Sequence, residues 1–121
     1  MFSNLSNLVI VVVEDDNDIR TLLGAFLDRS DANVIMASNA LEGLEAIKNT
    51  LPDLVLSDIK MPGMDEIRAL GSDAANSVPV IAMSAHFSRT DGDRINRAHF
   101  RACLPKPFTP DKLVETILGV L

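Results

Sequence analysis

Four acidic residues stand directly after two short apolar segments of the chain. The acidic run Glu14–Asp16 follows the apolar run 8–13, and Asp58 follows the run 54–57. Both runs are short and continuous. Such runs are typical of strands in a parallel sheet that is buried on both faces. Because parallel strands end at one edge of their sheet, we expect the four carboxylates to converge there. Carboxylates that converge need a cation, and such hard oxygen ligands suit Mg²⁺.

A lysine and a hydroxyl occupy equivalent positions after two further apolar segments. Lys106 lies between two prolines just after the segment 102–104, and Ser84 directly follows the segment 79–83. The prolines restrict the backbone on both sides of the lysine, and the bond from Lys106 to the second proline is a candidate cis peptide. Four carboxylates, a lysine and a hydroxyl make up the set that a magnesium-dependent phosphoryl-accepting site requires.

Each of these features also has a purely structural interpretation. Acids that open a helix interact favourably with its dipole, and an Asp before Met-Pro-Gly favours a turn. Most lysines are surface charges, and Ser84 can be an ordinary residue at a strand end. We favour the phosphoryl site because all of these residues occur together, each at the end of an apolar segment.

The segments that must position these side chains alternate between strand and helix patterns. This alternation indicates a parallel α/β sheet in a single domain. Short apolar segments predict strands at 8–13, 34–37, 53–57, 79–83 and 102–104.

Apolar residues recur at helical spacing between and after the predicted strands. Weaker patterns predict helices at 65–70 and 91–99, with a loop at 71–77. The candidate capping residues of the clearer helices are Asp16 or Asn17, Ser38 or Asn39, and Thr109. The stripes that we expect to face the core are Ile19, Leu22, Leu23, Phe26 and Leu27; Leu41, Leu44 and Ile47; and Leu113, Val114, Ile117, Leu118 and Leu121.

Composition excludes several classes of protein. A length of 121 residues suits one domain, and the net charge of −6 argues against a protein that binds a nucleic-acid backbone. The single cysteine excludes an internal disulfide. The longest apolar run, 8–13, is far shorter than the roughly 20 residues needed to span a bilayer. We therefore expect a cytoplasmic protein without nucleic-acid or membrane contacts.

Four segments together resemble the receiver domain of two-component response regulators. They are Glu14-Asp15, the stretch from Asp58 to Asp65 (DIKMPGMD), Ser84-Ala85 and Lys106-Pro107-Phe108. The resemblance covers essentially the whole chain, 1–121, as one receiver domain. It implies a flavodoxin-like three-layer sandwich, with a five-stranded parallel sheet of order 2-1-3-4-5 and five helices.

The resemblance implies a role for each acidic residue. Asp58 would be the phosphoacceptor, taking a phosphoryl group from the phosphohistidine of a sensor kinase or from a small phosphodonor. Asp15 and Asp58 would bind Mg²⁺ directly, with the backbone carbonyl of Lys60, and Glu14 would act through water. Asp16 falls just outside the acidic pair when the first helix is aligned with the family.

The resemblance also implies how the signal leaves the site. Lys106 would neutralise the phosphoryl charge and Ser84 would move to engage it, which favours one of two packings of a surface. That surface comprises the fourth helix, the fifth strand and the fifth helix, and it would bind a downstream protein. Such a domain is a phosphoacceptor and not an enzyme acting on other substrates.

Several residues depart from the family pattern. Cys103 replaces the aromatic residue that usually stands three positions before the lysine, and we interpret it as a small buried side chain. His99-Phe100 replaces the usual Gly-Ala at the end of the fourth helix, and the third helix is about one turn shorter than usual. Lys60 and His86 fall where side chains control water access to the phosphoryl group, so we expect them to tune its lifetime.

Three alternative interpretations of the sequence remain open. A phosphotransferase of the haloacid dehalogenase type also uses a nucleophilic Asp with Mg²⁺, but it needs a second acid where Lys60 stands. A flavodoxin-like cofactor binder needs a phosphate-binding loop after the first strand, where this chain has three acids. The chain begins with Met1 and ends on the apolar segment 119–121, which suits either a stand-alone receiver or one excised from a larger regulator or hybrid kinase.

Overall fold

Five strands form a single parallel sheet in the computed structural model, which describes residues 5–58, 78–84 and 102–121. The strand order is β2-β1-β3-β4-β5, as the resemblance implied. β1 is an interior strand and pairs in parallel with both β2 and β3. The strand bounds are Val9–Val13 (β1), Asn33–Ala37 (β2), Leu54–Asp58 (β3), Val80–Ser84 (β4) and Ala102–Pro105 (β5).

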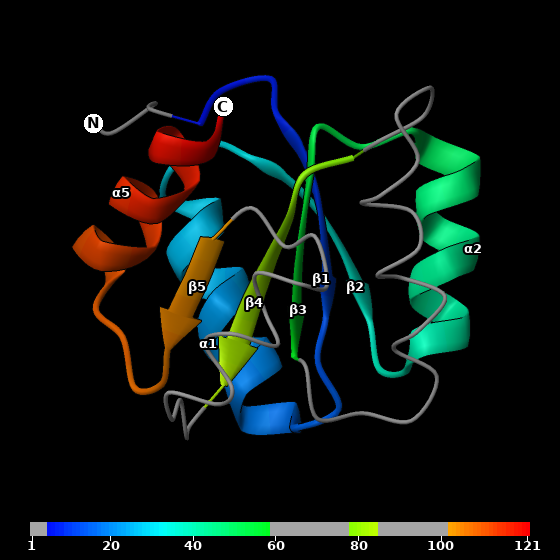
Figure 1. Cartoon of the computed structure of the whole chain (residues 1–121), viewed down its shortest axis with the longest axis horizontal. Coiled ribbons are helices and arrows are strands. Elements are labelled where there is room, and N and C mark those ends of the chain that lie inside the picture. Colours follow the sequence, from blue (N-terminus) through cyan, green and yellow to red (C-terminus); the bar gives the residue numbers. More distant parts are fainter. Residues whose placement is uncertain (1–4, 59–77, 85–101) are drawn as a thin grey trace.

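Helices cover both faces of this sheet (Figure 1). α1 (Asn17–Asp28) and α5 (Pro110–Val120) lie on one face, and α2 (Ala40–Thr50) lies on the other. This arrangement gives three layers, as predicted. The helices predicted at 65–70 and 91–99 and the loop at 71–77 lie outside the described residues.

The core consists of two layers because side chains alternate between the faces of each strand. On β1, Ile10 and Val12 pack on the side of α1 and α5, whereas Val11 and Val13 pack on the side of α2. All four are fully buried. A strand buried on both faces must be apolar at every position, which is why the run of valines in β1 shows no polar alternation.

Each described helix begins at a polar capping residue, and the structure selects one of the two candidates where the sequence left a choice. Asp16 caps α1 by accepting hydrogen bonds from the amides of Asp18 and Ile19 at 2.8 and 3.1 Å. Asn39 caps α2 and Thr109 caps α5. The carboxylate of Asp16 is therefore committed to the helix start.

The predicted helix stripes were too wide. Leu22 of α1 is 46% exposed and Leu41 of α2 is 67% exposed, although both were expected in the core. Leu118 and Leu121, at the end of the chain, are 46% and 54% exposed. A helix that packs on a flat sheet buries the centre of its stripe and leaves the flanking positions at the rim. The centres of the α1 and α5 stripes are Leu23, Leu27, Leu113 and Ile117, and all four are buried.

Cys103 is exposed, so its interpretation as a buried side chain was wrong. Along β5, Leu104 is fully buried in the core beneath α1 and α5, and the side chains on either side of it are exposed. Among the strands of the described residues, β5 pairs only with β4 and lies at the edge of the sheet. A residue of an edge strand that points away from the packed helices is not enclosed by the core.

α2 packs very closely on β1. A Cβ atom added to Gly43 would lie 2.6 Å from a methyl carbon of Val13, so the helix approaches to a distance that only glycine permits. Val13 directly precedes the acidic run. The position of α2 is thus coupled to the strand that carries the candidate site.

Candidate functional site

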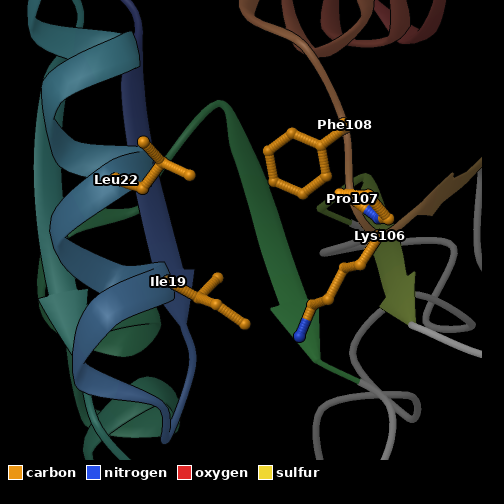
Figure 2. A pocket seen from close by; sticks show the side chains of 5 residues that line it. All are labelled: Ile19, Leu22, Lys106, Pro107 and Phe108. Atoms are coloured by element: carbon orange, nitrogen blue, oxygen red, sulfur yellow. The ribbon is translucent and has the colours of Figure 1, made fainter.

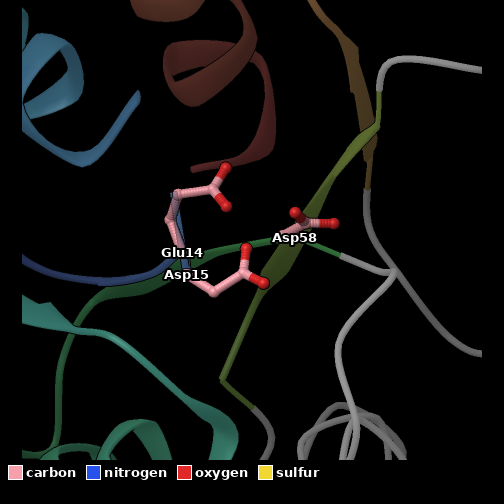
Figure 3. Close-up of side chains that lie close together, drawn as sticks. All are labelled: Glu14, Asp15 and Asp58. Carbon is pink, nitrogen blue, oxygen red and sulfur yellow. The ribbon is translucent and has the colours of Figure 1, made fainter. Parts of the chain in front are cut away.

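The three acidic residues Glu14, Asp15 and Asp58 meet at the carboxyl ends of β1 and β3. Val13 pairs in register with Ser57, so the residues that follow them end at the same edge of the sheet. One carboxylate oxygen from each of the three lies within 4.8 Å of the others (Figure 3). Glu14 is buried, Asp58 is half-buried and Asp15 is exposed. The predicted convergence is therefore present for these three acids.

Lys106 brings a positive charge into this cluster from the end of β5. Its Nζ donates to Glu14 Oε1 at 2.5 Å and to Asp58 Oδ2 at 3.3 Å. Only 12% of the lysine side chain is exposed. The Lys106-Pro107 peptide bond is cis, as the sequence suggested. The sequence indicated that the lysine would reach the acids, but not that its shorter contact would be with Glu14.

Burial and charge shift two pKa values at this site. Burial raises the pKa of Glu14 to about 7, although the hydrogen bond from Lys106 acts in the opposite direction. Burial alone would lower the pKa of Lys106. Its hydrogen bond to Glu14 and the nearby charges of Asp58 and Glu14 outweigh that effect and raise it. Lys106 is therefore protonated at neutral pH, whereas Glu14 keeps its proton to a higher pH than an exposed glutamate does.

The donor set fits a magnesium ion. Both oxygens of Glu14 already have protein partners, Lys106 and the amide of Asp16, the latter at 3.3 Å. Asp15 is exposed beside the half-buried Asp58, so a cation can approach this pair from solvent. Mg²⁺ commonly takes one or two carboxylates and keeps several waters, which matches two accessible carboxylates at a surface-facing edge.

The other residues assigned from the sequence are described only in part. Ser84 is the last residue of β4 and pairs in register with Pro105, so its backbone lies one residue from Lys106 at the same sheet edge. Its side chain is outside the described part of the chain, as are Lys60, His86 and the turn at His99.

A largely apolar pocket of about 240 Å³ lies beside Lys106 (Figure 2). Ile19 and Leu22 project into it from α1, facing Phe108 from the loop between β5 and α5. Lys106 and Pro107 complete the lining. Ile19 and Leu22 were predicted to face the core, and no sequence pattern predicted this pocket. The apolar residues of α1 and the apolar Phe108 after Lys106 are the sequence signal that could have predicted the pocket.

The comparison with known proteins now identifies the family. The family model of the response regulator receiver domain matches residues 10–118. The chain belongs to the response regulator receiver family. It is a receiver domain of the kind used in two-component signalling, and this membership displaces the haloacid dehalogenase and cofactor-binding alternatives.

Similar sequences include stand-alone and composite regulators. The chain is 30% identical over 116 residues to the polar-differentiation response regulator DivK of Brucella anthropi, covering 93% of this chain and 94% of DivK. It is 36% identical over 119 residues to the response regulator Rre1 of Synechocystis, and 36% identical over 114 residues to the DNA-binding transcriptional regulator NtrC of Escherichia coli. The match covers 93% and 90% of this receiver domain, but only 51% of Rre1 and 24% of NtrC.

Solved structures share the fold. The chemotaxis protein CheY4 of Vibrio cholerae superposes with a TM-score of 0.85 at 23% identity, covering 94% of this receiver domain and 98% of CheY4. A receiver domain protein from Clostridium thermocellum superposes with a TM-score of 0.82 at 25% identity and covers 93% of each chain. Within the described residues, no helix is long and apolar enough to cross a membrane.

Proposed function

We propose that this receiver domain is a phosphoacceptor whose Asp58 takes a phosphoryl group, in a Mg²⁺-dependent reaction, from a sensor histidine kinase or a phosphotransfer protein. The observation that carries the proposal is the convergence of Asp58 with Asp15, Glu14 and Lys106 at one edge of the sheet. We further propose that residues 1–121 act as one domain in the cytoplasm and transform no other substrate.

Asp15 and Asp58 would hold the metal, together with the backbone carbonyl of Lys60, and Glu14 would act through a water molecule. The bound ion would neutralise charge on the phosphoryl oxygens as the group is transferred. The carboxylate of Asp58 then attacks phosphorus, the bond from phosphorus to the donor nitrogen breaks, and an acyl phosphate forms on Asp58.

Lys106 and Ser84 would respond to the new charge. The phosphoryl group adds roughly −1.5 to −2 charge and strong acceptor oxygens beside Asp58. Lys106 already lies 3.3 Å from Asp58 and is protonated, so it can pair with these oxygens after a small movement. Ser84 would donate its hydroxyl to a phosphoryl oxygen from the end of β4.

The proposed output surface includes β5, α5 and the fourth helix, and would bind a downstream protein. In its described part, Leu118 and Leu121 expose apolar side chains and Cys103 is also exposed. Cys103 has no aromatic ring to swing between a buried and an exposed position. We therefore propose that the relay along β5 uses shifts of the Lys106 loop and of α5.

The proposed entry side for the phosphodonor is the pocket lined by Ile19, Leu22 and Phe108. A protein that delivers a phosphoryl group to Asp58 must cover the surface beside Lys106, and in the described part of the chain this pocket offers apolar surface there. Leu22, which is half-exposed on α1, offers such a donor an apolar contact without touching the carboxylates.

Modification of the intact protein tests the proposed function. The wild type is incubated with MgCl₂ and either acetyl phosphate or beryllofluoride, and the adduct is followed by intact mass or by NMR. Asp58→Asn keeps the size of the side chain but removes the nucleophile, so it serves as the matched control. We expect one adduct on the wild type, none on Asp58→Asn and none in EDTA. A wild type that is never modified, or a variant that is modified equally, would refute the assignment.

A further inference from the structure

We propose that Arg20 of α1 is a positioning residue for cation binding at the acidic cluster, because its guanidinium holds the peptide that joins Glu14 to Asp15. This inference rests on the proposed function, since it concerns the same metal site. It adds a residue to which the sequence patterns assigned no role.

The contacts of Arg20 connect α1 to the turn before it. Nη1 donates to the backbone carbonyl of Glu14 at 2.8 Å, and Nη2 donates to the side-chain oxygen of Asn17. The amide of Arg20 also donates to the carbonyl of Asp16 at 3.0 Å. One side chain thus ties the first turn of the helix to the end of β1, and it is half-buried while doing so.

The carbonyl that Arg20 holds controls the direction of the Glu14 and Asp15 side chains. It belongs to the peptide between Glu14 and Asp15, so a rotation of that peptide turns both carboxylates relative to Asp58. Two other contacts constrain the same turn. The amide of Glu14 donates to Ala37 of β2 at 3.0 Å, and the amide of Asp16 donates to Glu14 Oε2 at the longer distance of 3.3 Å. Neither of them restrains the Glu14 carbonyl.

The fork shape of the guanidinium suits this task. Arg presents several donors in one rigid plane, so a single side chain bonds the Glu14 carbonyl and Asn17 at once. Lys carries the same charge but donates from one flexible ammonium group. Arg20→Lys therefore keeps the charge near the cluster and removes the two-point hold.

Charge and position make opposite predictions for an uncharged replacement. The positive charge of Arg20 repels Mg²⁺. If charge were the only effect, removing it would strengthen the binding of Mg²⁺ to the three carboxylates. Losing the hold on the Glu14 carbonyl would weaken it, because the ligands are no longer preorganised. Arg20→Met separates the two effects, because the lost charge would raise the affinity for Mg²⁺ and the lost hold would lower it.

The experiment measures the Mg²⁺ dissociation constant of the full chain by titrating MgCl₂ at constant ionic strength and following amide shifts by NMR. We expect Arg20→Lys and Arg20→Met each to weaken Mg²⁺ binding about 10-fold, which is typical for the loss of a residue that orients metal ligands. Arg29→Met removes the same charge at the other end of α1 and should change the constant less than twofold.

A second control separates positioning from a loss of stability. Thr21 donates its hydroxyl to the carbonyl of Asn17 at 2.9 Å, in the same helical turn but without touching the Glu14 peptide. Thr21→Val removes this hydrogen bond and should leave the Mg²⁺ dissociation constant unchanged, whatever change in urea midpoint it causes. For Arg20→Lys, saturating Mg²⁺ should restore the rate of beryllofluoride adduct formation.

The outcomes distinguish this inference from the proposed function. If the wild type binds Mg²⁺ and Arg20→Lys binds it equally well, or if Arg20→Met binds it more tightly, Arg20 does not position the ligands and only this inference falls. If Thr21→Val weakens binding as much as Arg20→Lys, the effect is one of stability and the inference also falls. If the wild type binds no Mg²⁺, both proposals fall.

Discussion

Lys106 already supplies the acidic cluster with a positive charge. Its Nζ lies between the buried carboxylate of Glu14 and the half-buried carboxylate of Asp58. An unpaired buried charge costs several kcal/mol, so this lysine stabilises the folded chain as well as serving the proposed chemistry. The same residue is thus under a structural and a functional constraint.

Replacing Lys106 by Met should destabilise the protein in a pH-dependent way. At pH 8 we expect a loss of about 3 kcal/mol in the free energy of unfolding, because buried Glu14 must then stay ionised without its partner or take up a proton. Near pH 5 the loss should be smaller, since Glu14 is then protonated. Urea unfolding followed by far-UV circular dichroism measures both values. Glu14→Gln combined with Lys106→Met should recover part of the loss at pH 8; no recovery would show that the pair is not the cause.

Glu14 should make the metal-free protein less stable as pH rises from about 4.5 to 7. The pKa of Glu14 is 4.5 in its ordinary state and about 7 in the fold, so the folded chain binds more protons than the unfolded chain between these values. The contribution to the slope is at most about 1.4 kcal/mol per pH unit. Urea unfolding in EDTA at several pH values measures the slope for the wild type and for Glu14→Gln, and equal slopes would contradict the assignment.

The residue types at the site were predictable, but their pairing was not. Three acids and Lys106 each follow an apolar segment, and strand topology alone brings such positions together. The preference of Lys106 for Glu14 depends on the lysine side chain reaching from the end of β5, past β4 and β3, to the end of β1, which no local pattern encodes. The role of Arg20 was missed for the same reason, because its partner is a backbone carbonyl and not a side chain that a motif could show.

At the scale of the elements, the close approach of α2 to β1 links packing to the site. Gly43 lies against Val13, and Val13 leads directly into Glu14. The helix start is fixed as well, because the side chain of Asn39 accepts the amide of Glu42 while Glu42 accepts from the amide and hydroxyl of Ser38. α2 is therefore held at its cap and at its contact with β1.

Gly43→Ala should destabilise the protein, whereas Gly119→Ala should not. The added methyl group at Gly43 clashes with Val13, and such overpacking typically costs about 1 to 3 kcal/mol, which outweighs the gain in helix propensity. A Cβ at Gly119 meets no atom within 4 Å, so the same substitution there should stabilise α5 by up to about 1 kcal/mol. Urea unfolding compares the two variants, and equal effects would rule out the steric explanation.

Burial could not be predicted in segments that are too short to show a regular alternation of apolar and polar residues. β5 has four residues, so its sequence does not reveal which side chains face the core, and Cys103 was assigned to the wrong environment. β3 and β4 each end one residue later than predicted, because Asp58 and Ser84 are polar but still pair in the sheet. The capping residues were predictable, since their chemistry is local.

At the scale of the whole molecule, three of the carboxylates that contribute to the domain's net charge of −6 lie together at one edge of the sheet. Like charges at close range oppose folding, and a bound divalent cation removes that opposition. Ligands that bind only the folded state stabilise it by mass action. The metal site should therefore be visible as a change in global stability.

Mg²⁺ should raise the free energy of unfolding of the wild type by about 2.7 kcal/mol at a concentration 100 times its dissociation constant. Asp15→Asn should be more stable than the wild type in EDTA, because one of three clustered charges is removed, and should gain little from Mg²⁺. Urea unfolding with MgCl₂ or with NaCl of equal ionic strength measures the difference. An equal gain for the variant would show that the ion binds elsewhere.

The exposed thiol of Cys103 also has a practical consequence. It is the sole cysteine in a sequence that contains neither Trp nor Tyr. A maleimide dye attached there would therefore label one defined position at the sheet edge beside α5, giving a spectroscopic reporter without prior mutagenesis. Partial burial raises the pKa of this thiol, so the coupling requires mildly alkaline buffer. A substitution that removes the family's aromatic reporter thus supplies an attachment point for an artificial one.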